Sequence, residues 1–176
     1  MSKVFISAVS LLLLATGAQA DVTVVGAYSN RVITDVRAQG YDIQLWRDGS
    51  QYFGFFLSAG GLADNIPLGT LDNLQVDDAA KTISFRVKMS VGRSSLNGDS
   101  WEPTRDLYQF SGTLFPDQIS GDLVHVDELL PDTPATHEDV KLYRNREEEQ
   151  ALPAFTSYQQ WLDLARKMMT SRGPKW

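Results

Sequence analysis

The chain contains no cysteine, and this absence excludes several classes of protein. Without cysteine there are no disulfides, so the small secreted scaffolds that disulfides hold together are excluded. Attachment of a lipid to a cysteine, as in bacterial lipoproteins, is excluded for the same reason. The chain has 176 residues, of which 43% are hydrophobic, so it is long enough to bury a core that needs no cross-link.

Histidine and clustered positive charge are also scarce. The chain has two histidines, His125 and His137, whereas zinc sites need several converging ligands. No Asp-x-Asp-x-Asp-Gly loop for calcium is present. We therefore predict no metal and no other cofactor. The net charge is −6 and no Lys/Arg-rich cluster occurs, so nucleic acid is not expected as a partner.

Catalytic signatures are missing as well. Ser94-Ser95 lies in a polar segment without the pattern of a nucleophile elbow. Gly60-Gly61 is interpreted as a turn and not as a phosphate-binding loop. These absences favour a protein that is not an enzyme.

Residues 1–20 have the features of a secretory signal peptide. Lys3 is followed by an apolar run from Val4 to Leu14 and then by the small-x-small cleavage pattern Ala18-Gln19-Ala20. The alternative is a membrane anchor, but about 15 apolar or small residues are short for a span. We therefore predict a cleaved signal peptide at 1–20 and a single β-barrel domain at 21–176. The mature protein would be periplasmic or secreted from a bacterium and would not span the membrane.

Most of the remaining chain alternates apolar and polar residues between turn signals, which is typical of short β-strands. The clearest case is the hairpin at 106–127. Two segments do not alternate: 29–40 is a loop or contains a short helix around 35–39, and 90–105 is a long polar loop. We predict strands at 21–28, 41–47, 51–58, 69–76, 82–89, at the two arms of 106–127, and at 138–144.

The turns predict which residues face each other. A turn at Pro116-Asp117 places Tyr108 opposite His125 on one face. The opposite face carries polar side chains on both strands, so the two strands support the same register. The same turn also pairs Phe110 with Leu123 and Gly112 with Gly121. The other two hairpins give the pairs Val76 with Ile83, Asp72 with Val87, Leu45 with Tyr52, and Tyr41 with Phe56.

About eight strands in up-and-down order predict an all-β fold, an antiparallel barrel with tight turns at one end and longer connections at the other. We call the second end the loop end. Apolar residues recur at helical spacing at about 155–170, where Thr156 or Ser157 begins a helix and Gly173-Pro174 ends it. This helix either binds a partner or a membrane surface, or packs outside its own barrel. We favour packing, because Gln51–Ser58 is apolar on both faces and needs a cover.

This arrangement resembles the lipocalin-like (calycin) barrels over most of the mature chain. The resemblance is one of architecture. The Gly-x-Trp signature near the first strand of true lipocalins is replaced by Val25-Gly26-Ala27-Tyr28. It implies a barrel that binds a small apolar ligand in its interior.

The predicted pairing places several polar and aromatic side chains on the inner face near the loop end. They could orient a ligand or do acid–base chemistry, or they could be ordinary strand-end residues. Trp101 either contacts a ligand or plugs the barrel. The candidate ligand-binding residues are Tyr41, Phe56, Asp72, Met89, Trp101, Arg105, Tyr108, Phe110 and His125.

Three functions follow as hypotheses. The first is an exported, non-enzymatic protein that binds a small apolar or amphipathic ligand in a barrel open at the loop end. The second is a periplasmic interaction or inhibitor module that uses the loop end against a protein partner. The third is a barrel cyclase or isomerase that uses His125, Asp72 and Tyr108.

Overall fold

The computed structural model describes residues 22–62, 66–94 and 101–176. The predicted signal peptide lies outside these residues and stays a prediction. The described residues form two helices, α1 (Arg146–Gln150) and α2 (Tyr158–Arg172). They also form the strands β1 (Thr23–Ser29), β2 (Val32–Ile33), β3 (Arg37–Asp48), β4 (Gln51–Leu62), β5 (Leu68–Thr70), β6 (Asp72–Asp77), β7 (Thr82–Met89), β8 (Arg93–Ser94), β9 (Glu102–Pro103), β10 (Asp106–Leu114), β11 (Gln118–Asp127) and β12 (Thr136–Arg144).

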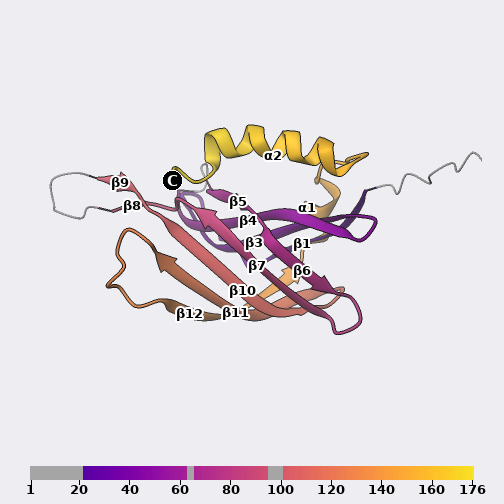
Figure 1. Cartoon of the computed structure of the whole chain (residues 1–176), viewed down its shortest axis with the longest axis horizontal. Helices are drawn as coiled ribbons and strands as arrows, with labels where there is room; N and C mark the ends of the chain where they lie inside the picture. The colour runs from indigo at the N-terminus through magenta and orange to yellow at the C-terminus, as the bar shows by residue number, and fades with distance from the viewer. Residues whose placement is uncertain (1–21, 63–65, 95–100) are drawn as a thin grey trace, which may run out of the picture.

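Nine strands follow one another around an antiparallel sheet in the order β5-β4-β3-β1-β12-β11-β10-β7-β6, and the short β2 pairs with β3 beside this path (Figure 1). The two ends of this order, β5 and β6, are neighbours in the chain and are separated by Leu71 alone. The sheet therefore curls into a nearly closed barrel. The predicted all-β, up-and-down barrel is confirmed. Its strands number nine because the segment predicted as one strand, 69–76, is divided into β5 and β6.

The register of the β10–β11 hairpin is confirmed pair by pair. Tyr108 lies opposite His125 and Phe110 opposite Leu123. Gly112 lies opposite Gly121, and a Cβ at Gly112 would come within 2.2 Å of a backbone oxygen of the partner strand. Glycine is therefore required where these two strands cross most closely.

The predicted register of the β3–β4 hairpin is wrong by two residues. Asp48 pairs with Gln51, so the turn is Gly49-Ser50, and Tyr41 lies opposite Ser58 and not opposite Phe56. Gly49 has a φ of +57°, which a turn of two residues can require at its first position. Because the error is an even number of residues, every side chain keeps its predicted face.

Three segments predicted as loops or turns are partly strand. Residues 90–105 include β8 and β9, which pair with each other. Residues 29–40 contain β2 and the start of β3, and no helix forms there. Gly60 and Gly61 continue β4 opposite Gln39 and Ala38 and do not form a turn. Backbone pairing with β3 maintains these residues in a strand without any alternation of side chains.

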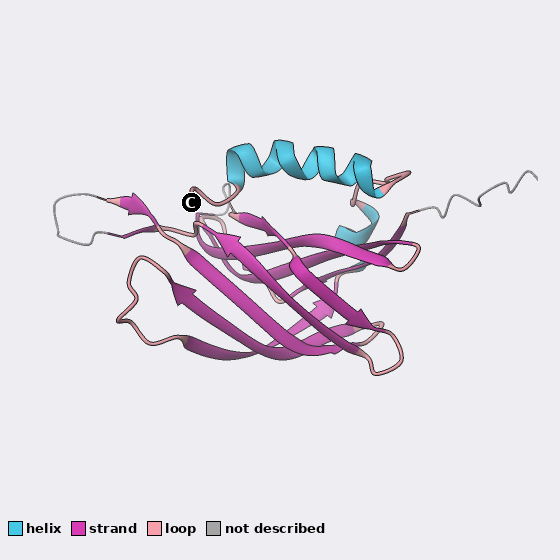
Figure 2. Cartoon of the chain, viewed as in Figure 1, coloured by secondary structure: helices cyan, strands magenta, loops and turns pink. Residues whose placement is uncertain are grey.

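Two cores stabilise the fold, one inside the barrel and one between the barrel and α2. Figure 2 shows α2 lying outside the barrel. Trp46, Phe53 and Phe55 point outward from β3 and β4 and pack against Trp161 and other residues of the helix. The predicted helix and its packing on the barrel are confirmed. Ser157 caps the start of α2, and Gly173 ends it. The inner core includes Phe56, Ile83, Phe85, Val87, Met89, Phe110 and Leu123.

Candidate functional site

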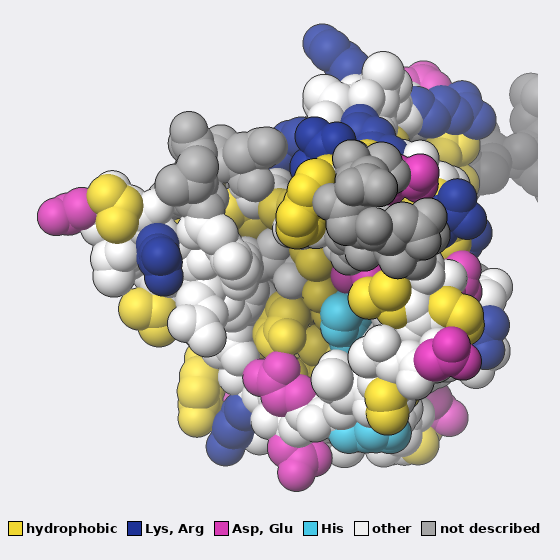
Figure 3. Space-filling view, turned by 90° about the vertical axis from the view of Figure 1, so that its left-hand side faces the viewer, with side chains coloured by type: hydrophobic (Ala, Val, Ile, Leu, Met, Phe, Trp, Pro, Cys, Tyr) yellow, Lys and Arg dark blue, Asp and Glu magenta, His cyan; other side chains and the backbone are white. Residues whose placement is uncertain are grey.

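A cavity of about 960 Å³ opens at the loop end of the barrel. Its walls come mainly from the facing parts of β3 and β4, and Val91, Tyr108 and Glu138 complete it. Figure 3 views this end and shows a hollow with hydrophobic side chains at its floor and charged side chains around it. We call this hollow the mouth cavity.

Tyr41 provides one polar group of the mouth cavity. Its hydroxyl donates to Glu138 Oε2 at 2.9 Å, and its ring stacks on Phe56 with 5.5 Å between centroids. Burial and the hydrogen bond to Glu138 raise the pKa of Tyr41 well above its usual value. The phenol is therefore protonated across the physiological pH range.

Tyr108 provides the second aromatic wall. Its ring stacks on His125 at a centroid distance of 4.5 Å, and its hydroxyl lies 3.4 Å from Ser58 Oγ. Burial raises the pKa of Tyr108 to about 12. Both tyrosines of the cavity are therefore neutral hydroxyls that can donate or accept a hydrogen bond.

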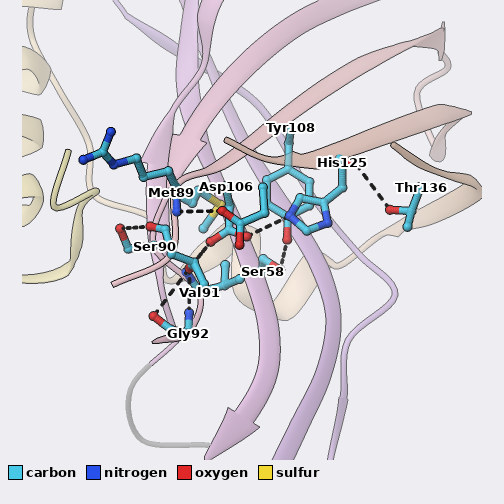
Figure 4. A network of polar contacts seen from close by, with 12 residues as sticks. Ser58, Met89, Ser90, Val91, Gly92, Asp106, Tyr108, His125 and Thr136 are labelled. Carbon is cyan, nitrogen blue, oxygen red and sulfur yellow. Dashed lines mark hydrogen bonds and ion pairs between the residues drawn. The ribbon is translucent and has the colours of Figure 1, made fainter. Parts of the chain in front are cut away.

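Beside Tyr108, a buried carboxylate anchors the connection between β7 and β10 (Figure 4). Asp106 Oδ1 lies 2.7 Å from His125 Nε2, while Oδ2 accepts from Val91 N at 2.8 Å and from the Thr104 hydroxyl. Burial raises the pKa of Asp106, but the hydrogen bonds from His125, Thr104 and Val91 outweigh burial, so the net pKa is lowered. Asp106 is therefore a charged anchor that holds Val91 at the cavity wall.

The candidate residues predicted from the sequence do not all lie together. Tyr41 and Tyr108 line the mouth cavity, and His125 stacks directly behind Tyr108. The other apolar candidates, Phe56, Met89 and Phe110, belong to the packed inner core. The predicted site is thus a cavity at the loop end, with the packed side chains of the inner core beneath it.

Three predicted placements need correction. Asp72 does not face Val87 inside the barrel but pairs with Arg86 and is exposed, because the register shifts by a bulge at Asn73, where φ is +50°. Trp101 is 62% exposed and does not plug the barrel. Arg105 is also exposed, and its backbone N–H donates to Asp127 Oδ1 at 3.2 Å.

Sequence reasoning missed Ser58, Glu138 and Asp106. Asp106 has a signal that could have found it, because it lies two residues before Tyr108 and so shares its inward face. Ser58 and Glu138 also have local signals. Ser58 lies opposite Tyr41 once the β3–β4 hairpin has its correct register, and Glu138 alternates along β12 with the inward-facing Val140 and Leu142. The contact between Ser58 and Tyr108 depends on curvature of the sheet, because β4 and β10 are not neighbours in it.

The described residues contain no cluster of three or more His, Asp and Glu side chains that could hold a metal ion. In this part of the chain, no helix is long and apolar enough to cross a membrane. The chain matches no family model, no curated protein and no solved structure.

Proposed function

We propose that the protein is an exported, non-enzymatic binding protein of lipocalin-like type that holds a small amphipathic ligand in the mouth cavity. The observation that carries this proposal is a cavity of about 960 Å³ whose lining combines two neutral tyrosines, the carboxylate of Glu138, the guanidinium of Arg37 and both amide and apolar side chains. Cavities of several hundred Å³ with a few converging polar groups are typical of small-molecule sites.

The packed inner core limits where such a ligand can lie. Phe56, Phe85, Phe110 and Leu123 are all buried in one cluster below the cavity. A ligand would therefore rest on Tyr41 and Tyr108 at the mouth, with its polar group near Glu138 and Ser58. The apolar part would lie along Val32 and Val91.

Gly60 offers a direct test. It lies on the same face of β4 as Ser58, it lines the cavity, and a Cβ added there would meet open space. We expect Gly60→Trp to fill the cavity without disturbing the fold. The matched control is Ser111→Trp, which places the same side chain on the exposed outer face of β10.

Native mass spectrometry of each protein purified from its own envelope measures the outcome. We expect wild type and Ser111→Trp to carry the same small molecule and Gly60→Trp to carry none. A molecule retained by Gly60→Trp, or no bound molecule on wild type, would show that the cavity is not a ligand site.

A specific observation favours a second function, binding of a protein partner at the loop end. Three large apolar side chains of the β2–β3 hairpin are exposed: Val32 by 66%, Ile33 by 58% and Val36 by 65%. Exposed apolar groups clustered beside a pocket are typical of interaction surfaces. Ile33→Ser with Val36→Ser would abolish co-purification of a protein partner and leave the small ligand in place.

A further inference from the structure

The barrel wall is interrupted between β4 and β6. Leu71 N donates to Gly54 O at 3.1 Å and joins the two sides there. Towards the turn end, no strand pairing joins β4 to β6 among the described residues. At the turn end itself, the Tyr52 hydroxyl donates to the Asp78 carboxylate at 2.8 Å and connects the two sides a second time. We call the opening between these two contacts the side window.

On both sides of the side window, the pattern of strand pairing directs backbone groups towards the opening. Along β4, the backbone N–H and C=O groups of alternate residues point to the same side. Gly54 O and Ser58 N form hydrogen bonds on the side of β5, with Leu71 and Pro67. The backbone groups of Tyr52, two residues before Gly54, therefore point to that side as well, into the side window. Just before β7, the carbonyl of Lys81 accepts a hydrogen bond from Leu114 N of β10. Because backbone direction alternates along a strand, the odd-numbered residues of β7 form backbone hydrogen bonds with β10 and the even-numbered residues form them with β6.

The same alternation shows which backbone groups of β6 point away from β7. Gln75 and Asp77 lie opposite Ser84 and Thr82, so their backbone groups bond to β7. The backbone groups of Leu74 and Val76 must then point away from β7, into the side window. An edge strand of this kind is a template for pairing with another chain.

The side window contains a groove of about 590 Å³ that suits a strand. Tyr52, Leu74 and Val76 line it from the barrel, and Trp161 and Leu162 line it from α2. The lining includes one charged side chain, the exposed Asp72, and no cation. From Asp72 to Asp77 the edge spans roughly 16 Å at about 3.3 Å per residue, which is enough for a short extended peptide.

We propose that the side window binds an extended segment of a partner protein, which adds as a strand along the free edge of β6. Its apolar side chains would alternate towards Tyr52, Trp161 and Leu162, and a lysine or arginine would lie beside Asp72. Main-chain hydrogen bonds to Leu74 and Val76 supply part of the affinity, and the alternating side chains supply specificity. This site is independent of the ligand in the mouth cavity.

A random dodecapeptide library displayed on phage, selected against the full chain, provides the probe. We expect enrichment of peptides that alternate apolar residues and carry a basic residue near one end. The best peptide is then synthesised in two forms, one unmodified and one with its central amides N-methylated. Because N-methylation removes backbone donors, we expect it to weaken binding by about tenfold or more.

Two protein variants test whether the negative charge of Asp72 contributes to binding of the peptide. Asp72→Lys should weaken the peptide by about fivefold, as expected for one exposed ion pair. Asp132→Lys makes the same change at an exposed position between β11 and β12 and should leave binding unaltered. In NMR spectra, the amides of Tyr52, Leu74 and Val76 should shift on addition of the peptide.

Several results would overturn the proposal. These are no enriched sequence, equal binding of the N-methylated peptide, or amide shifts confined to the mouth cavity. Concentration-dependent shifts of the same amides without peptide would instead identify a second copy of this chain as the occupant. That result would also overturn the proposal.

Discussion

Two aspartates are almost equally buried in this protein and respond to burial in opposite ways. Asp106 is 2% exposed on the inner face of β10, and Asp42 is 1% exposed on the outer face of β3. The pKa of Asp106 is lowered, whereas the pKa of Asp42 is raised. Burial alone therefore does not decide which form of a carboxyl group the fold prefers.

The difference lies in the number of hydrogen bonds. Asp106 receives them from a histidine, a hydroxyl and a backbone amide. Asp42 accepts a hydrogen bond from Ser29, and Arg31 approaches its Oδ2 at 2.8 Å as an ion pair without hydrogen-bond geometry. Burial raises the pKa of Asp42, and the contacts with Ser29 and Arg31 offset this only in part.

The comparison also separates two roles in the fold. Asp106 joins β10, β11 and the connection after β7, so it organises the wall of the mouth cavity. Asp42 joins β3 to the segment after β1, and Arg31 continues from there to Glu148 of α1 at 2.7 Å. A well-satisfied carboxylate thus supports the candidate site, and a less satisfied one holds a peripheral helix.

Asp106→Ala should have the largest effect. It leaves the backbone amide of Val91, the Thr104 hydroxyl and His125 without their common acceptor. We expect a loss of about 3 kcal/mol in the free energy of unfolding at neutral pH, measured by urea denaturation. Asp139→Ala, at an exposed position on β12, is the control and should change stability by less than about 0.5 kcal/mol. Equal losses in both variants would contradict an anchoring role.

The acid limb of the stability curve gives a second, smaller effect. Because the folded pKa of Asp106 lies below its ordinary value of 3.8, its contribution is fully present above about pH 4. That contribution is lost as the pH falls from there through the lowered folded pKa. Asp106→Asn should therefore flatten the loss of stability in this window. An unchanged acid limb in urea titrations across this range would argue that Asp106 is not a charged anchor.

The sequence predicted the barrel, its outer helix and the β10–β11 register because each depends on local patterns. Alternation sets the faces of β10 and β11, and the turn at Pro116-Asp117 sets their alignment. The helix follows from helical spacing and from the second apolar face of β4. These local patterns agree with the final fold, because no longer-range interaction favours a different structure for the same segments.

The candidate site was only half predictable. Tyr41 and Tyr108 share an inward face that alternation reveals, but Asp72 was misplaced because a bulge at Asn73 changes the register. Such a bulge leaves little trace in a sequence, since one residue with positive φ is enough to make it. Ser58 was missed because the β3–β4 register was predicted two residues away from the observed one, in which Ser58 lies opposite Tyr41. The contact of Ser58 with Tyr108 depends on curvature of the sheet, which no local pattern encodes.

Asp42→Asn should have the smallest effect and the opposite dependence on pH. Because the folded pKa of Asp42 is raised, wild type gains stability from this group below pH 3.8 and loses it as the pH rises through the folded pKa. The asparagine variant lacks this loss, so its stability relative to wild type should improve as the pH rises. At neutral pH we expect a net difference within about 1 kcal/mol, because the lost pairing with Arg31 is offset by the lower cost of burying a neutral group.

The measurement is the urea midpoint of Asp42→Asn and wild type at a series of pH values, with Asp35→Asn as an exposed control. The control should follow wild type throughout. A relative stability that falls with rising pH would mean that Arg31 and Ser29 outweigh burial at Asp42. Asp42 would then behave like Asp106, and the contrast between the two buried carboxyl groups would reduce to a difference in partners without a difference in charge preference.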